Sequence, residues 1–379
     1  MKRLFVLSLA MASPLLLQSS ANAQTVATDP VGFTTVSCLG NSDTFVSIPL
    51  TRPSEYVGAI ASVGANTITV SGTPWTVNQF VYAAGTQPKR YYVLIGPAAN
   101  PKEGHIYFIN SNTNNQLTVD TTQDNLTGIP SNGTVQLVVT PYWTPATLFP
   151  ASDANVSFTP TTSSASYKTQ LLIPNYAAAG INQGYSPIYF FSNNVDGTTN
   201  NVGWRVVGNN TTDHGDDPLL PDGYMVVRHQ NGAPTLPLVS VGAVLTKKLA
   251  VPLITSASQK QDNSVSMIRP VDVTITDTGL TPADGSFVAT PPVLTVKNRN
   301  PPLKDQLLLF DNTQVGFNKT PSAIYYYSTG SPRTTGWKLF GDGLANHDSD
   351  LIPVGSAIVI RKAVTTSGQT AFWTNSPTY

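Results

Sequence analysis

Lys168-Thr169-Gln170-Leu171-Leu172-Ile173 and Lys304-Asp305-Gln306-Leu307-Leu308-Leu309 are two versions of one stretch, and the match extends well beyond them. Each is followed by a Gly-apolar-Asn step and an aromatic run, which reads Ile188-Tyr189-Phe190-Phe191-Ser192 in the first version and Ile324-Tyr325-Tyr326-Tyr327-Ser328 in the second. Each version closes on a short apolar strand ending in arginine. Residues 168–228 and 304–361 are therefore predicted to form one β unit that is used twice, with the copies packed together.

The composition favours an all-β protein. Only 11% of the residues are charged and only two are Glu, while Pro (30) and Gly (28) are abundant. No stretch shows the 3.6-residue apolar period of a helix over three turns, whereas short alternating apolar runs bounded by Gly, Asn and Pro recur throughout. We predict an N-terminal small β-barrel or sandwich followed by a larger β domain that contains an internal duplication.

The predicted domains are a β-hairpin domain over residues 24–150, a linker over 151–166 and a duplicated β domain over 167–379. In the first domain, two segments share one pattern, in which a Gly opens a β-branched strand and an Asn/Gly turn reverses it, at residues 58–70 and 104–119. A segment beginning at Asp262 also echoes one beginning at Asp43, each ending before a proline. If that echo is real, the two segments are equivalent strands.

Residues 1–23 have the features of a cleavable secretory signal: two cationic residues, a short apolar stretch and a small-x-small end. We expect the mature chain to begin at Gln24 and to lie in the periplasm, outside the cell or on its surface. No later segment is apolar enough to span a membrane. Cys38 is the only cysteine, so no intramolecular disulfide can form, and we expect it to be a small buried side chain.

Charge argues against nucleic acid as a partner. The full chain has 21 basic and 21 acidic residues, and loss of Lys2 and Arg3 with the signal leaves 19 basic against 21 acidic, a net charge of −2. No basic cluster is present that could follow a phosphate backbone.

Several motifs resemble those of a family of secreted proteins found as paralogues in verrucomicrobial bacteria. They are residues 28–33 (TDPVGF), 50–53 (LTRP), 311–312 (DN), 318–322 (NKTPS) and the closing 373–379 (WTNSPTY). The resemblance covers essentially the whole mature chain. It implies a secreted β-rich protein and carries no activity, cofactor or catalytic residue, because the motifs consist of turn and strand residues.

Two matched loops hold the candidate metal ligands. Dense carboxylate and amide oxygens on a loop suit Ca²⁺, so a calcium site in each copy is one hypothesis, with the ligands Asp213, Asp216, Asp217, Asn346, Asp348 and Asp350. The alternative, which we favour, is that these side chains cap turns. The histidines of the same loops, His214 and His347, are softer ligands that do not suit calcium. Folding alone does not account for them.

The aromatic strands raise the possibility of sugar binding through flat ring faces. The candidate residues are Tyr189, Trp204, Tyr325, Tyr327 and Trp337. Side chains alternate along a strand, so one face of each aromatic strand is expected to be core, and we favour core packing over ligand contact.

No catalytic motif is present. A glycosidase needs two carboxyl groups across a cleft, and the only two Glu residues, Glu55 and Glu103, lie beside turns. We therefore predict an exported, non-enzymatic structural, adhesive or surface-binding protein that contacts polysaccharide or envelope components. The alternative is a carbohydrate-binding or carbohydrate-processing protein. We expect no cofactor unless the two matched loops bind calcium.

Overall fold

The structure is a computed structural model that describes residues 29–150, 158–195, 201–291, 302–330, 334–343 and 345–379. Nearly all of its regular structure is β, which confirms the all-β class. A short helix, α1 (Pro145–Leu148), and a 3-10 turn, η2 (Thr276–Thr278), are the helical elements of these residues. The predicted signal, residues 1–23, lies outside the described residues, as does the first part of the predicted linker. Among the described residues, no helix is long and apolar enough to cross a membrane.

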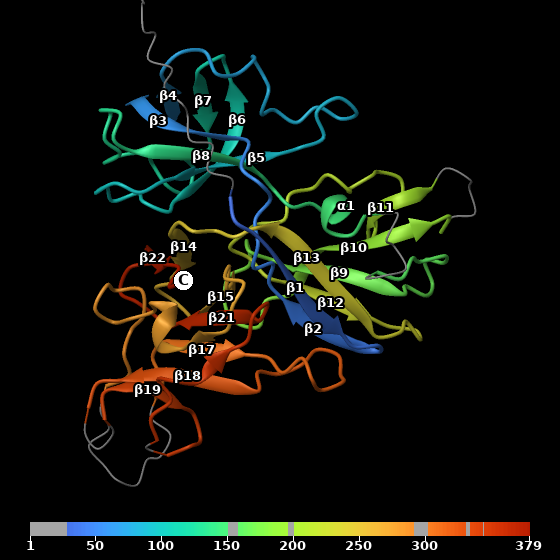
Figure 1. Ribbon diagram of the computed structural model, residues 1–379. Coiled ribbons are helices and arrows are strands. Elements are labelled where there is room, and N and C mark those ends of the chain that lie inside the picture. Colours follow the sequence, from blue (N-terminus) through green and yellow to red (C-terminus); the bar gives the residue numbers. More distant parts are fainter. Residues whose placement is uncertain (1–28, 151–157, 196–200, 292–301, 331–333, 344) are drawn as a thin grey trace, which may run out of the picture.

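A closed six-stranded barrel forms one end of the molecule (Figure 1). Its strands, in the order β3-β4-β7-β6-β5-β8, are β3 (Tyr56–Val63), β4 (Thr67–Val70), β7 (Gln116–Val119), β6 (Ile106–Asn112), β5 (Tyr91–Ile95) and β8 (Gln136–Pro141). The two hairpins predicted from their shared pattern are β3-β4 and β6-β7, and each has a register shift at the same place, after Ile60 and after Ile109. Closure leaves the barrel without open edges, as expected for such short strands.

Two five-stranded antiparallel sheets with the same strand order lie below the barrel. The first runs β11-β10-β9-β12-β2, with β11 (Val202–Val206), β10 (Tyr185–Asn193), β9 (Thr169–Pro174), β12 (Met225–His229) and β2 (Ser42–Val46). The second runs β19-β18-β17-β21-β15, with β19 (Gly336–Leu339), β18 (Ala323–Ser328), β17 (Gln306–Leu309), β21 (Ala357–Lys362) and β15 (Gln261–Ser266). The matched sequence stretches therefore occupy matched strands.

A two-stranded ribbon accompanies each sheet. Strand β1 (Val31–Cys38) pairs with β13 (Leu236–Ala243), and β14 (Leu249–Ile254) pairs with β22 (Thr370–Asn375). A smaller pair joins β16 (Val273–Thr274) to β20 (Leu351–Ile352). We call β1, β2 and β9–β13 the first unit, and β14, β15, β17–β19, β21 and β22 the second unit.

The echo between the Asp43 and Asp262 segments is confirmed as a structural equivalence. Strand β2 is the edge strand next to β12, and β15 is the edge strand next to β21. This pairing corrects the predicted division at residue 150, because residues 31–46 belong to sheets of the larger domain. The barrel is inserted between β2 and β9 of the first unit. Alternation along a strand identifies a strand but not a partner some 180 residues away, so the sequence had no signal for this insertion.

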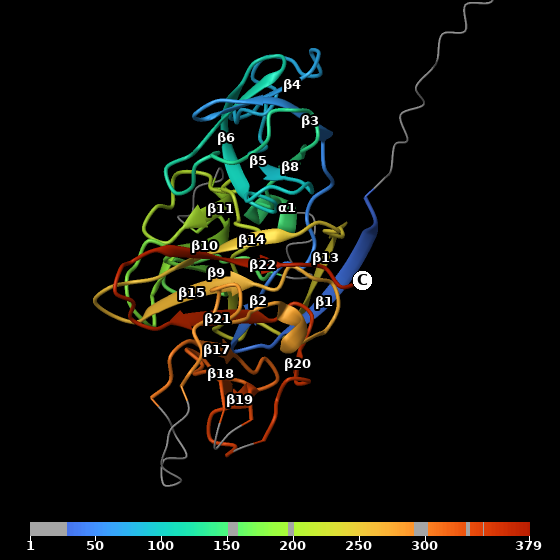
Figure 2. The same ribbon diagram turned by 90° about the vertical axis from the view of Figure 1, so that its left-hand side faces the viewer.

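The two sheets share a core. Phe45, Leu172 and Val226 of the first unit pack with Leu308 and Val359 of the second. Each unit also has its own core, and the barrel has a third around Val93, which is fully buried. In the view turned by 90°, the strands of the two sheets lie below the barrel, with the β1–β13 ribbon at one side (Figure 2). Burial therefore joins the two units across their sheet faces.

Candidate ligand cleft between the two units

An ion pair in the first unit holds a loop of the second. Arg228 donates from Nε and Nη2 to the two carboxylate oxygens of Asp43, at 2.6 and 2.8 Å. The backbone N–H of Asn318, in the second unit, donates to Asp43 Oδ2 at 2.7 Å, and Arg228 Nη2 donates to Asn318 Oδ1 at 2.8 Å. Asn318 has a positive φ of 51°, which asparagine tolerates better than most residues and which turns its N–H toward the carboxylate.

The reciprocal arrangement occurs in the second unit. Arg361 donates to both oxygens of Asp262, at 2.7 and 3.0 Å, and the backbone N–H of Asn182, in the first unit, donates to Asp262 Oδ2 at 2.7 Å. Asn182 has a φ of 54°. We call these two sets of residues the paired latches. These six residues are far apart in the sequence. Only the fold places each Asp–Arg pair against the asparagine loop of the other unit.

Removal of one latch charge should weaken the whole fold. The Asp43 side chain is fully buried, so Asp43→Asn leaves the Arg228 guanidinium without its anion. We expect the free energy of unfolding to fall by about 1.5–3 kcal/mol, the usual range for a hydrogen bond to a charged group. Urea denaturation measures it. The matched control is Asp120→Asn, an exposed carboxylate in the barrel, which should cost less than about 0.5 kcal/mol. Equal losses in the two variants would contradict the role of the latch.

A cleft opens beside the latches, between the two units. Its volume is about 320 Å³, inside the range of roughly 300–1,000 Å³ for small-molecule sites. Three other pockets measure about 30, 130 and 190 Å³ and fall below that range. The cleft is lined by four aromatic rings and a polar rim: Phe45, Tyr185, Tyr224 and Phe310, with Asn182, Gln183, Asn318, Lys319, Thr320 and Arg361.

The cleft combines ring surface with amide and hydroxyl groups and with three charged side chains, Asp262, Lys319 and Arg361, of which Asp262 and Arg361 form an ion pair. Phe45 and Phe310 stack with centroids 3.9 Å apart, and Tyr185 and Phe310 are partly exposed. Burial raises the pKa of Tyr185 to about 12, with Asp43 adding to the rise and Arg228 opposing it, so its hydroxyl stays protonated at neutral pH. Burial also lowers the pKa of Lys319, against the opposing effect of nearby carboxylates. Ring surface beside many hydrogen-bonding groups suits a ligand with many hydroxyl groups.

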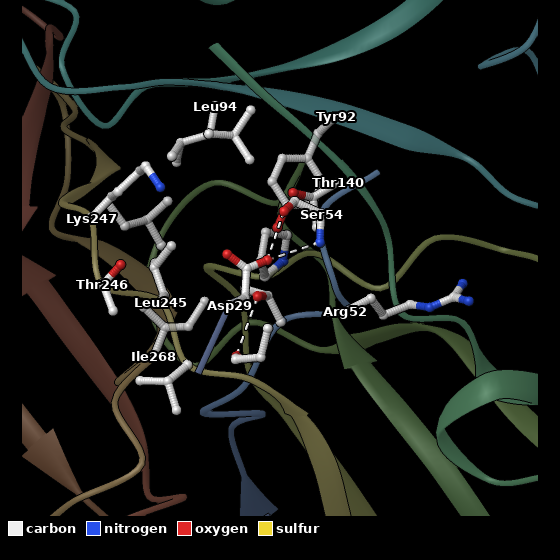
Figure 3. A pocket seen from close by; sticks show the side chains of 16 residues that line it. Asp29, Arg52, Ser54, Tyr92, Leu94, Thr140, Leu245, Thr246, Lys247 and Ile268 are labelled. Atoms are coloured by element: carbon white, nitrogen blue, oxygen red, sulfur yellow. Dashed lines mark hydrogen bonds between the residues drawn. The ribbon is translucent and has the colours of Figure 1, made fainter. Parts of the chain in front are cut away.

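The pocket at the junction of barrel and units is too small for a ligand (Figure 3). Asp29 lies in it and accepts from Ser54 Oγ at 2.6 Å and from the Ser54 N–H at 3.2 Å. Tyr92 and Leu94 of the barrel face it across the gap, with Leu245 and Lys247 from the connection between the units. Its volume of about 30 Å³ accommodates one or two water molecules. The pocket is therefore part of the joint between barrel and units.

Four of the five candidate sugar-binding aromatics are buried, as the favoured interpretation of core packing predicts, and the ligand-contact alternative is wrong for these four. Tyr189, Trp204, Tyr325 and Trp337 are between 2% and 6% exposed. Tyr327 is half-buried and meets the Trp337 ring at 5.7 Å. Rings with so little accessible surface cannot stack on a sugar. The prediction that these residues lie on strands is confirmed. Their side chains are buried because the faces of the strands that carry them pack into the cores of the two units.

The fold explains the two matched histidines. His214 Nδ1 contacts Asp217 Oδ2 at 2.9 Å, and the Tyr189 hydroxyl donates to the same oxygen at 3.1 Å. In the second unit, His347 Nδ1 contacts Asp350 Oδ2 at 2.8 Å, and the Tyr325 hydroxyl donates to it at 2.9 Å. Each Tyr–Asp–His set ties a loop to an aromatic strand of its own sheet. The histidines are thus positioned by the carboxylates that were considered as metal ligands.

The other proposed calcium ligands also bind protein groups, in their own loops or in neighbouring segments. Asp213 Oδ1 accepts from the Gly215 N–H at 2.9 Å, as in a turn cap. Asp348 accepts from the Trp337 N–H at 2.7 Å and from Asn346 Nδ2 at 2.9 Å. Burial raises the pKa of Asp216, helped by Asp213 and opposed by a hydrogen bond from Tyr82. Across the described part of the chain, no three His, Cys, Asp or Glu side chains form a group that could hold a metal ion.

Calcium is therefore expected to leave stability unchanged. Because these carboxylates cap turns and bind tyrosine and histidine, we expect the same melting midpoint with calcium chloride as with EDTA. Differential scanning calorimetry of the mature chain measures it. A midpoint that rises with calcium, and does not rise with magnesium, would restore the calcium hypothesis.

One polar cluster of the barrel had no signal in the sequence. Asp124 Oδ2 lies 2.6 Å from His105 Nδ1 and accepts from the Tyr107 hydroxyl at 2.7 Å, while Lys102 pairs with Oδ1. The His105 ring also packs on Phe372 of the second unit, with centroids 4.2 Å apart. Asp124 stands in a Gln-Asp-Asn run that looks like an ordinary turn. The cluster fastens the barrel to the β14–β22 ribbon.

This cluster predicts a loss of stability in acid. Burial alone would raise the pKa of Asp124, but hydrogen bonds from His105, Lys102 and Tyr107 outweigh it and hold this pKa below its usual range. A carboxyl group whose pKa is depressed in the folded state stabilises the fold at pH values above its unfolded-state pKa of about 3.9. This stabilisation is lost as the pH falls from there toward the folded-state pKa. We expect the difference in melting midpoint between wild type and Asp124→Asn to shrink from pH 7 to pH 3. A constant difference would contradict this assignment.

The remaining candidates for chemistry bond to structural partners. Glu55 accepts from Lys89 Nζ at 2.6 Å and from the Tyr91 hydroxyl at 2.7 Å, and Glu103 pairs with Lys248 at 3.1 Å. Cys38 is 1% exposed, which confirms a small buried side chain, and burial raises the pKa of its thiol to about 12. A thiol with that pKa is a poor nucleophile at neutral pH.

No protein-family model matches this chain, and neither the search of curated proteins nor that of solved structures found a similar protein.

Proposed function

We propose that the chain is an exported, non-enzymatic protein with a structural, adhesive or surface-binding role. The observation that carries this proposal is that the matched Asp–Arg pairs of the two units form structural contacts between the units. Asp43, Arg228, Asp262 and Arg361 bind across the unit boundary through Asn318 and Asn182, so these groups serve rigidity. We also infer that the units arose by duplication, because their sequence match and strand order agree.

Export is supported by the signal-like first 23 residues and by the resemblance to secreted verrucomicrobial proteins. Its test is expression of the full chain in a Gram-negative host, fractionation, and mass spectrometry of the product. We expect a periplasmic or extracellular chain that begins at Gln24. A chain that retains Met1 in the cytoplasm would contradict the proposal, and a chain that starts at Gln24 and self-associates or attaches to envelope fractions would support it.

Carbohydrate binding is the second candidate, and the cleft between the units is the observation that favours it. Partly exposed rings beside amide and hydroxyl groups are suited to a sugar, whose ring stacks and whose hydroxyl groups need many hydrogen bonds. The cleft replaces the core aromatics as the proposed site. Its volume suits one or two sugar residues of a polymer that enters from solvent.

Filling the cleft tests the second candidate. Thr320 lines the cleft and is exposed, so Thr320→Arg should block it without disturbing a core. Gln314 is exposed on the same connection outside the cleft, and Gln314→Arg is the matched control. We expect wild type and Gln314→Arg to sediment with insoluble cellulose, chitin or xylan and Thr320→Arg to remain in solution. Failure of the wild type to bind any of them would reject carbohydrate, and equal binding of both variants would reject the cleft.

A further inference from the structure

The β1–β13 ribbon has an exposed apolar face. Phe33 and Val241 are direct cross-strand partners and are 76% and 56% exposed. Val31 and Val239 extend the same face and are 72% and 43% exposed. Burial alternates along β1, so its other face is turned inward, where Thr34 and Ser240 share a hydrogen bond of 2.8 Å. Contiguous apolar surface of this kind marks an interaction site more often than chance exposure does.

The far edge of β1 is also open. The strand has eight residues, pairs only with β13 among the described residues, and contains no charged residue and no proline. Natural sheets normally protect such an edge with a charge, a proline or a covering segment, because its free N–H and C=O groups are a template for another strand. In the part of the chain that the structure describes, none of these protections is found on β1, although its partner β13 carries Pro237.

In the equivalent ribbon of the second unit, β14–β22, the strand that corresponds to β1 is protected. Strand β14 carries Pro252, and its Ala250 N–H donates to the carbonyl of Gly104 in the barrel at 2.9 Å. On the outer face, the Phe372 ring lies against His105 of the barrel. One ribbon is thus covered at its edge and on its face by the chain's own barrel. The β1–β13 ribbon is likewise an antiparallel pair beside a five-stranded sheet, and the described part of the chain supplies no such cover for it.

We propose that β1 pairs antiparallel with β1 of a second copy of this chain, forming a four-stranded sheet β13-β1-β1-β13 across a two-fold axis. An antiparallel pair of identical edges is self-complementary, since each residue meets its counterpart by symmetry. Neither edge carries a charge, so their approach involves no like-charge contact and no desolvation of an ion. The apolar faces around Phe33 and Val241 then become one continuous surface. The pairing uses a different face from the cleft and does not depend on carbohydrate binding.

Sedimentation velocity of the mature chain over a range of concentrations tests the proposal. The contact is limited to the pairing of two eight-residue strands, so we expect a dissociation constant on the order of micromolar or weaker. Phe33→Lys and Val241→Lys place charges on exposed positions of the ribbon and should weaken the dimer about tenfold or more. Val315→Lys is the matched control, because Val315 is 67% exposed on a loop of the second unit. Melting curves establish that all three variants fold.

Cross-linking identifies the contact itself. Cys38 is buried, so a cysteine introduced singly at Val31, Phe33, Thr35 or Ser37 is the sole accessible thiol. We expect at least one of these four variants, or a mixture of two, to form disulfide-linked dimers, and Val315→Cys to form none. A monomer at every concentration, or a dimer that Phe33→Lys leaves intact, would overturn the proposal. Binding of a monomer to phosphatidylcholine vesicles, lost in Phe33→Lys, would also overturn it and assign the face to lipid.

Discussion

Replacement of Asp305 by alanine is expected to lower the free energy of unfolding by about 3–5 kcal/mol, the cost of leaving a buried charge without its partner. The Asp305 and Lys362 side chains form an ion pair and are 0% and 2% exposed. Lys362 Nζ also donates to the Ser286 carbonyl at 2.7 Å, and the carboxylate accepts from the N–H groups of Val288 and Ala363, each at 2.7 Å. Urea denaturation of the mature chain measures the loss.

The first unit supplies the control for this experiment. At the equivalent positions it has Thr169 and His229, which are paired across the strands and are both fully buried. The double variant Asp305→Thr/Lys362→His transplants that pair into the second unit and leaves no lone lysine. We expect it to lose clearly less stability than Asp305→Ala. If the single variant were as stable as wild type, the buried pair would have no structural role.

Replacement of Trp337 by alanine is expected to cost about 3–5 kcal/mol, the range for truncation of a buried tryptophan. Its ring is 2% exposed and packs against Phe287, with centroids 4.8 Å apart. The counterpart Trp204 packs against Phe158 at 4.7 Å, so Trp204→Ala should behave alike. If these rings were ligand contacts, both variants would keep their melting midpoint and lose only binding.

Two controls sharpen that test. Trp337→Phe keeps most of the ring and should lose markedly less stability than the alanine variant, since less volume is emptied. Val315→Ala removes an apolar side chain from an exposed loop and should change stability by less than about 0.5 kcal/mol. Thermal unfolding followed by near-ultraviolet circular dichroism reports packing around the tryptophans directly. A melting midpoint of Trp337→Ala equal to that of wild type would refute the core assignment.

The barrel hairpins and the all-β class could be predicted because their signals are local. The Gly and Asn residues between β3 and β4 and between β6 and β7 specify turns over a few positions, and alternation within each strand specifies its faces. The match between the two units was readable for the same reason, since matched turns lie at matched spacings. The equivalence of the Asp43 and Asp262 segments was visible as an echo, and strand pairing established it.

The candidate functional residues could be predicted only in part, and none of those named from the sequence lines the cleft. The sequence indicated His214 and His347 as a matched pair, and the structure adds the tyrosine and aspartate that hold each of them. It offered the aromatic residues as ligand contacts but favoured core packing, and Tyr189, Trp204, Tyr325 and Trp337 are buried in cores. Asp124 gave no signal, because its partners His105 and Tyr107 are 19 and 17 residues away and meet it only when β6 and β7 pair.

By itself, the sequence determined what short-range physics controls: strands rather than helices, the positions of the turns, two matched units and a buried lone cysteine. The tertiary structure decided which strands are neighbours, that the barrel is inserted into the first unit, and that each Asp–Arg pair secures a loop of the other unit. It also covers β14 with the barrel, whereas no other described segment covers the far edge of β1. The physical reason is that alternation along a strand specifies the face on which a side chain lies, whereas its partners depend on closing long loops, which no local pattern encodes. The contact between Ser47 and Ser356, for example, joins residues 309 positions apart.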